Sequence, residues 1–247
     1  MHPVEFLVSA LTKVAPYPKG VVPVPKQIAG TAFFPGGSGL WQPNGSDVLP
    51  HFPVGKVMVL GHDFHSEIGY HQSLAKCGEN LKGPTWRNLL KLLREADIEP
   101  EQCFFTNAYM GLRAGSNTTG KFPGAYDADF VERCRSFLAE QIAVQQPRLI
   151  LTLGNYVPSI LASLSTDLGQ WRKNHSLIQL DALGVPIVTD VRFHEDYNWR
   201  TAVVALTHPS LRPANIGRRH YRELRGNEAE VAMVREAINV SGIELNG

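Results

Sequence analysis

The chain has few cysteines, little excess charge and no long apolar segment. Its 247 residues include 3 cysteines, an odd number without a Cys-x-x-Cys pair. This argues against a disulfide framework and against zinc or iron–sulfur ligation by cysteine. The net charge is only +1, so global charge does not indicate a nucleic-acid partner. No apolar run approaches the ~20 residues of a membrane helix, and the N-terminus lacks a secretory signal. We therefore expect a cytoplasmic protein that does not enter a membrane.

The composition is that of a folded protein, with 43% apolar and 19% charged residues. The length allows one sizeable core. Residues 4–14 have helical apolar spacing, but residues 15–53 hold eight prolines and six glycines, which disrupt helices and interior strands. We predict an N-terminal helix and Pro/Gly-rich arm over residues 1–54, packing on a single domain over residues 55–247, in a monomeric protein.

From residue 56 onward, short apolar runs alternate with helical patterns. The predicted strands are 56–60, 103–106, 148–153, 186–190 and 202–207. The predicted helices are 85–97, 127–145, 155–165 and 219–239. Residues 176–181 and 186–190 can instead form a local hairpin, so the sheet need not be wholly parallel. The pattern predicts an α/β fold, a three-layer α/β/α domain with a central, mostly parallel sheet.

Short polar motifs follow three of the strand-like runs. Gly61-His62-Asp63 follows the first, Asn107 the second, and His208-Pro209-Ser210 the last. Residues just past the carboxyl ends of parallel strands converge on one crevice. We expect these motifs to share one pocket that holds a carboxylate, an amide and an imidazole.

These residues resemble the uracil-DNA glycosylase superfamily. Gly61 and Asp63 match the first family motif, Gly-Gln-Asp-Pro-Tyr-His. Residues 105–115, which include Asn107 and an Arg-Ala-Gly sequence, are similar to a family strand and loop, and residues 208–210 are identical to the family's His-Pro-Ser. Residues 151–154 also look like a family strand that ends in Gly. The resemblance covers roughly residues 55–225 and implies a uracil-DNA glycosylase-like fold.

The chemistry of N-glycosidic hydrolysis suits these residue types. The reaction makes a cationic sugar and an anionic base, so it needs negative charge near the sugar and donors around the base. The resemblance implies that Asp63 stabilises the sugar and activates water. Asn107 matches the pairing edge of uracil, and His208 donates to the departing base. Further contacts to the base are expected from Gly61, His62, Phe64 and His65.

Each role has a structural alternative. Asp63 can brace a turn, Asn107 can form an Asx-turn, and His208 can be a buried histidine in a Pro-containing turn. Two positions depart from the family: His65 stands where a Tyr blocks a thymine methyl, and Lys76 stands where a Phe stacks on the base. The base therefore stays open, as uracil or a related deaminated base.

A basic segment follows His-Pro-Ser and is expected to contact single- or double-stranded DNA. Leu211 or Arg212 lies near the family's wedge position, and a wedge fills the stack that an extruded base leaves. Phosphate contacts are expected from Ser210, Arg212, Arg218, Arg219 and Arg222. The alternative is a solvated helix face that carries ordinary arginines. His62, His65 and His71 lack a strong zinc spacing, and we expect neither a metal nor a cofactor.

The leading hypothesis is a DNA-repair glycosylase that hydrolyses the N-glycosidic bond of a deaminated base. A catalytically silent relative that binds DNA or a nucleobase is the first rival. An esterase-like α/β hydrolase is the second, although the sequence lacks both a Gly-x-Ser-x-Gly elbow and a Gly-Asp-Ser opening.

Overall fold

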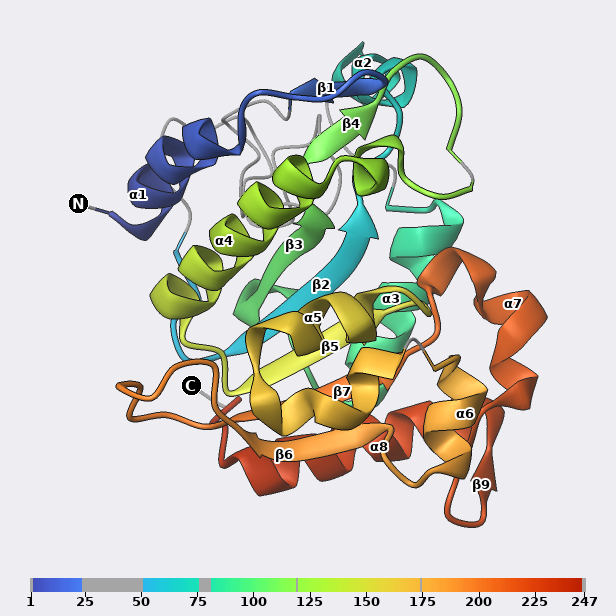
Figure 1. The fold of residues 1–247 in the computed structure, drawn as a ribbon. Coiled ribbons are helices and arrows are strands. Elements are labelled where there is room, and N and C mark those ends of the chain that lie inside the picture. The colour runs from blue at the N-terminus through green and yellow to red at the C-terminus, as the bar shows by residue number, and fades with distance from the viewer. Residues whose placement is uncertain (1, 24–50, 76–80, 119, 174, 246–247) are drawn as a thin grey trace. The chain divides into compact units, whose positions relative to one another are not determined.

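A computed structural model of the chain describes residues 2–23, 51–75, 81–118, 120–173 and 175–245 (Figure 1). Most of the predicted arm and Lys76 lie outside these residues. The fold is α/β, as predicted, with a five-stranded sheet of order β3-β2-β5-β7-β6. The strands are β2 Val57–Asp63, β3 Cys103–Tyr109, β5 Leu149–Leu153, β6 Ile187–Val191 and β7 Thr201–Leu206.

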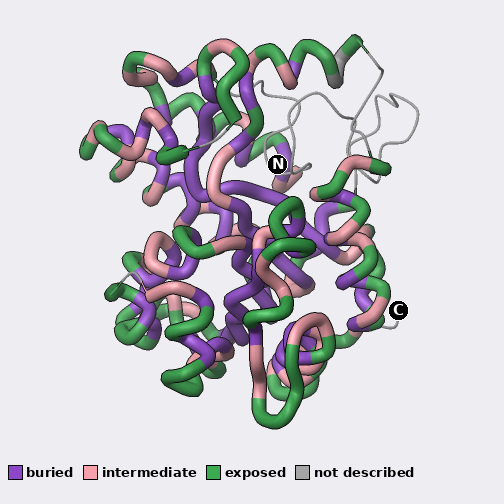
Figure 2. Tube along the Cα trace, turned by 90° about the vertical axis from the view of Figure 1, so that its right-hand side faces the viewer, coloured by how far each residue is buried: buried purple, intermediate pink, exposed green. Residues whose placement is uncertain are grey.

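The sheet is mostly parallel. β5 pairs in parallel with β2 and with β7, with Val57 opposite Leu149 and Leu153 opposite Leu206. β6 runs antiparallel to β7. β5 and β7 are buried along their whole length, whereas β6, at the edge, is partly exposed. Figure 2 shows buried residues along the central strands and exposed residues in many connecting segments. Strands covered on both faces need continuous apolar runs, which is why the sequence pattern identified them.

Contacts between residues group the chain into two compact units. The first unit comprises Met1–Phe52, Gly61–Asn80 and Phe104–Gln145. The second comprises Pro53–Leu60, Leu81–Cys103 and Gln146–Gly247. Both units draw on segments that are distant in sequence. The proposed boundary between residues 54 and 55 stays a prediction.

The first unit holds the N-terminal helix and the long helix α4. Residues 4–14 are helical as predicted, because α1 continues directly into η1 and both bury apolar side chains. Arg133 on α4 donates from Nε to the Val14 carbonyl at 3.0 Å and from Nη2 to the Pro16 carbonyl at 2.6 Å. Beyond this point β1 pairs antiparallel with β4. The elements are α1 Pro3–Ala10, η1 Leu11–Val14, β1 Val21–Pro23, α2 Glu67–Ala75, β4 Gly111–Arg113, η4 Pro123–Tyr126 and α4 Ala128–Gln145.

The second unit holds the other helices and a short hairpin. On α3 the side chains of Trp86, Leu89, Leu92 and Leu93 are buried, so this helix packs one apolar face inward. The elements are α3 Pro84–Glu95, η3 Pro100–Gln102, α5 Val157–Leu161, η5 Ala162–Leu164, η6 Thr166–Lys173, α6 Leu177–Ala182, η7 Pro209–Leu211, α7 Arg212–Asn215, η8 Ile216–Arg218, β8 His220–Tyr221, β9 Leu224–Arg225 and α8 Gly226–Ser241.

One alternative and one predicted helix start were wrong. Residues 176–181 do not form a strand, because Ser176 and Gln179 make a reciprocal capping box that starts α6. The closing helix begins at Gly226 rather than at residue 219. The intervening residues form the β8–β9 hairpin, in which Arg222 adopts a left-handed backbone with φ 54°.

The strands also run further than expected. Gly61, His62 and Asp63 are the last residues of β2, and Asn107 lies inside β3. Only His208 follows the end of its strand, β7. The backbone stays extended through the polar residues at the end of a strand, so the apolar pattern alone places the end of the strand too early.

Candidate active site

Asp63 is held by a buried arginine of the first unit. Arg113, the last residue of β4, donates from Nε to Oδ1 of Asp63 at 2.9 Å and from Nη2 to Oδ2 at 3.0 Å. This is a two-point ion pair, and the side chains of Arg113 and Asp63 are only 5% and 11% exposed. A parallel bridge between Ser66 and Arg113 brings the two segments together.

The arginine is itself fixed by its surroundings. Its Nη2 also donates to the Gly120 carbonyl at 2.9 Å, and its guanidinium lies 5.5 Å from the ring centroid of Phe122. The backbone carbonyl and the aromatic face both favour a cation. Arg113 therefore presents its donors to Asp63 from a defined position.

His62 completes this group. Its Nδ1 lies 2.6 Å from Oδ2 of Asp63, and its ring packs edge-on against Tyr109, with 5.2 Å between the centroids. Burial alone would raise the pKa of Asp63, but hydrogen bonds and charge from His62 and Arg113 outweigh burial and lower it below its ordinary 3.8. Asp63 is thus ionised at neutral pH. Because a carboxylate only accepts, Nδ1 of His62 carries the proton between them.

His65 is seated over a glycine. Its Nδ1 lies 3.3 Å from Oγ of Ser66, and that same Oγ accepts a hydrogen bond from the backbone N–H of Gly69 on α2. A Cβ on Gly69 would lie 1.8 Å from Nδ1 of His65. Burial lowers the pKa of His65, so the ring is neutral at pH 7. His65 is exposed, and Gly69 leaves the space that its ring occupies.

The other predicted base contacts in the first unit are in its interior. Phe64 is 1% exposed, and Asn107 is buried within β3. Next to Asn107, the hydroxyl of Thr106 donates to Oε1 of Gln141 on α4. The roles of Phe64, Asn107 and Gly61 in binding a base stay predictions.

His208 lies in a tightly held turn of the second unit. Its Nδ1 is 2.9 Å from Oγ of Ser210, and its carbonyl accepts from the backbone N–H of Leu211. Asn88 on α3 donates from Nδ2 to the Pro209 carbonyl at 2.8 Å. Gly154, with φ +92°, passes so close that a Cβ there would lie 3.4 Å from the Cβ of His208. A side chain at this left-handed position would strain the backbone beside His208.

The basic segment after this turn divides into exposed and buried residues. Leu211 is 55% exposed, and Ser210, Arg218 and Arg222 are exposed. Arg212 and Arg219 are buried and bind carboxylates. This corrects the predicted DNA contacts of Arg212 and Arg219, because their guanidinium groups are directed inward.

One comparison decides the family. A family model described as Uracil DNA glycosylase superfamily matches residues 53–226. The chain belongs to the uracil-DNA glycosylase superfamily. The range that matches the superfamily contains every residue predicted for the site. No curated protein matched the chain.

Sequence reasoning missed the partners of these residues. Arg113 stood in the Arg-Ala-Gly sequence, but nothing there indicated that it binds Asp63, 50 positions away. In the described parts of the superfamily member, no group of three or more His, Cys, Asp or Glu side chains is arranged to hold a metal ion. None of the described helices combines the length and apolar character that crossing a bilayer requires.

Proposed function

We propose that this superfamily member hydrolyses the N-glycosidic bond of uracil or a related deaminated base in DNA. The observation that carries the proposal is the Asp63 carboxylate at the end of β2, held by Arg113 and His62 within the range that matches the family. The sugar becomes cationic as the bond breaks, and a fixed carboxylate lowers the energy of that state.

Asp63 also orients the attacking water in this proposal. The described residues supply three donors to its carboxylate, two from Arg113 and one from His62. A carboxylate has about four acceptor sites, so one remains for a water molecule. With its pKa lowered, Asp63 acts through charge and orientation more than through basicity. The leaving base takes the electron pair of the broken bond, water forms the new bond to C1′ of the sugar, and the proton that water releases passes to solvent, from which the base anion is protonated.

The proposal assigns the base to Asn107 and His208. Asn107 offers an acceptor and a donor to the pairing edge of uracil. His208 donates a hydrogen bond to a base carbonyl as negative charge grows on it. Its hydrogen-bonding contact with Ser210 limits the orientations of the ring.

DNA contact is assigned to the exposed residues after His208. Arg218 and Arg222 are exposed and are assigned to phosphates, although Arg222 also pairs with Glu236 at 2.6 Å. Leu211 presents an apolar side chain to solvent. An inserted apolar side chain replaces the stacking that an extruded base gives up. In this proposal Ser210 makes a further contact to the DNA backbone.

A second candidate function is a catalytically silent glycosylase-like protein that binds DNA or a nucleobase. The two-point ion pair favours it, because Arg113 neutralises the charge that Asp63 would offer to the sugar. In that case Asp63 serves structure and not chemistry.

One experiment separates the two functions. The protein is incubated with single- and double-stranded oligonucleotides that contain uracil, hypoxanthine or xanthine, and abasic products are cleaved with alkali. The proposal expects product from at least one substrate. Binding without product from any substrate favours the silent protein.

A further inference from the structure

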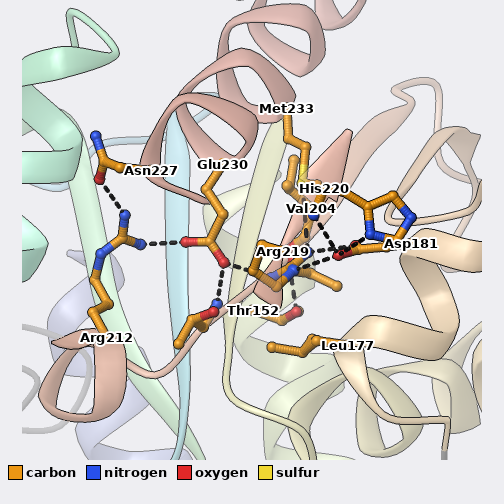
Figure 3. A network of polar contacts seen from close by, with 12 residues as sticks. Thr152, Leu177, Asp181, Val204, Arg212, Arg219, His220, Asn227, Glu230 and Met233 are labelled. Atoms are coloured by element: carbon orange, nitrogen blue, oxygen red, sulfur yellow. Dashed lines mark hydrogen bonds and ion pairs between the residues drawn. The ribbon is translucent and has the colours of Figure 1, made fainter. Parts of the chain in front are cut away.

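A buried network of charged side chains lies in the second unit (Figure 3). Glu230 on α8 accepts hydrogen bonds from Nη1 of Arg212 and from Nη1 of Arg219. Arg219 also donates to both carboxylate oxygens of Asp181 on α6, at 2.8 and 2.9 Å. We call these four residues the Glu230 network. It contains two positive and two negative groups, so its charges balance.

One end of the network holds the chain on both sides of His208. The backbone N–H of Thr207, immediately before His208, donates to Oε1 of Glu230 at 2.7 Å. Arg212, immediately after the turn Pro209–Leu211, donates to the other oxygen of Glu230. A single carboxylate therefore binds the residues that enter and leave the His208 turn.

The other end of the network has a different task. Asp181 accepts the backbone N–H of His220 at 3.1 Å, and with Arg219 it joins α6 to the start of β8. None of these contacts involves residues 207–212 directly. The network thus has one end at the His208 turn and one end at the hairpin.

The burial of these charges does not by itself show that the network stabilises the fold. Moving four charges out of water costs free energy that their mutual attraction offsets only in part, so buried ion pairs are weak evidence for a role in stability. What the network does provide is a fixed geometry, because every donor around Glu230 has a defined direction. Glu230 also lies beyond residues 53–226, the range that matches the family.

We propose that Glu230 is a positioning residue that fixes the His208 turn for catalysis. The inference rests on the proposed function, in which His208 donates to the departing base. Glu230 touches no reacting atom in this proposal, and it acts only through Thr207 and Arg212.

The test compares Glu230→Gln with the matched control Asp181→Asn. Each substitution keeps the shape of the side chain and removes one negative charge from the same network. The donors around residue 230 are all N–H groups, so the amide of Gln directs a donor at a donor. Asp181→Asn has the same kind of effect at the hairpin end. If Glu230→Gln does not fold, Glu230→Asp keeps the charge and shortens the reach to Thr207.

The expected result is a split between the two variants. Glu230→Gln lowers the single-turnover rate about 10- to 100-fold, the effect of a small displacement of a reacting group, while DNA affinity changes little. Asp181→Asn stays within about threefold of the wild-type rate. In a His208→Ala background the effect of Glu230→Gln disappears, because residues that act as a unit are not additive. Equal losses from both variants, or an undiminished effect in that background, would overturn the proposal.

A second readout does not depend on activity. The imidazole signals of His208, assigned in an NMR spectrum by their loss in His208→Ala, are compared in the two variants. Glu230→Gln is expected to shift them and Asp181→Asn to leave them in place. If the wild type releases no base, the proposed function fails while these spectra still decide whether Glu230 positions His208; unchanged signals in Glu230→Gln would contradict the inference.

Discussion

Arg113 donates hydrogen bonds to both carboxylate oxygens of Asp63, with Nε 2.9 Å from Oδ1 and Nη2 3.0 Å from Oδ2. The pair decides what Asp63 can do. It keeps the carboxylate ionised and oriented, and it also offsets part of its charge. The same ion pair therefore fits both a catalytic protein and a catalytically silent one, and substitution of Arg113 separates these two functions.

Arg113→Lys is expected to lower base excision about 10- to 100-fold. Lysine keeps the positive charge but cannot make two parallel bonds, so Asp63 loses its orientation. The measurement is a single-turnover excision rate on the best substrate. Arg133→Lys is the control, because Arg133 lies in the same unit and binds the backbone carbonyls of Val14 and Pro16. A rise in activity in Arg113→Lys would mean that Arg113 silences Asp63.

The lowered pKa of Asp63 predicts how stability depends on pH. The folded pKa lies below the ordinary value of 3.8, which is taken for the unfolded chain. The ionised carboxylate therefore adds stability that is fully present above that unfolded value and is lost as pH falls through the folded pKa. The difference in the free energy of unfolding between wild type and Asp63→Asn is expected to be largest near neutral pH, at about 3–5 kcal/mol for a broken buried pair.

Urea unfolding of both proteins across the acid range measures this difference. It is expected to stay level down to about pH 5 and to shrink at lower pH. A difference that grows on acidification would contradict the lowered pKa.

Gly69→Ala is expected to act through His65. The added Cβ would lie 1.8 Å from Nδ1 of His65, so the ring has to move. Ala favours a helix over Gly by about 1 kcal/mol, which offsets the cost of moving the ring, so the free energy of unfolding is expected to change little. The relative excision rates of uracil and thymine opposite guanine are expected to shift in the same direction as in His65→Ala.

Gly169→Ala is the matched control, since a Cβ there meets nothing within 4 Å. An unchanged ratio of rates in Gly69→Ala, together with a changed ratio in His65→Ala, would show that Gly69 does not position His65.

The sequence predicted the fold better than the site. β5 and β7 were found because buried parallel strands are continuous apolar runs. Ser176 and Gln179 have the spacing of a capping box, which marks the start of α6 in the sequence and argues against the alternative of a hairpin there. No motif near Arg219 in the sequence indicates that it pairs with Asp181, 38 positions away. Ion pairs between distant segments depend on tertiary packing, and an arginine run looks the same whether its members face solvent or the core.

That distinction predicts different effects for arginines in one segment. Arg218→Ala with Arg222→Ala is expected to weaken DNA binding for all bases alike. The slope of log affinity against log salt should fall by about 0.9 for each phosphate of the duplex that the variant no longer binds. Arg219→Ala is expected instead to lower the free energy of unfolding by about 3–5 kcal/mol, because it leaves the buried carboxylates of Asp181 and Glu230 without this cation.

Titration of labelled duplex at several salt concentrations, with urea unfolding in parallel, measures both effects. An unchanged salt slope in the double variant would remove Arg218 and Arg222 from the DNA-binding surface. Normal stability in Arg219→Ala would contradict the buried network.

The role proposed for Asp63 in the chemistry of base release can be measured directly. Single-turnover release of base is compared between wild type and Asp63→Asn, with DNA binding determined on the same samples. We expect release by the wild type and a loss of about 100-fold or more in the variant, with binding retained. Equal rates in the two proteins, or no release by the wild type from any deaminated substrate, would contradict that role.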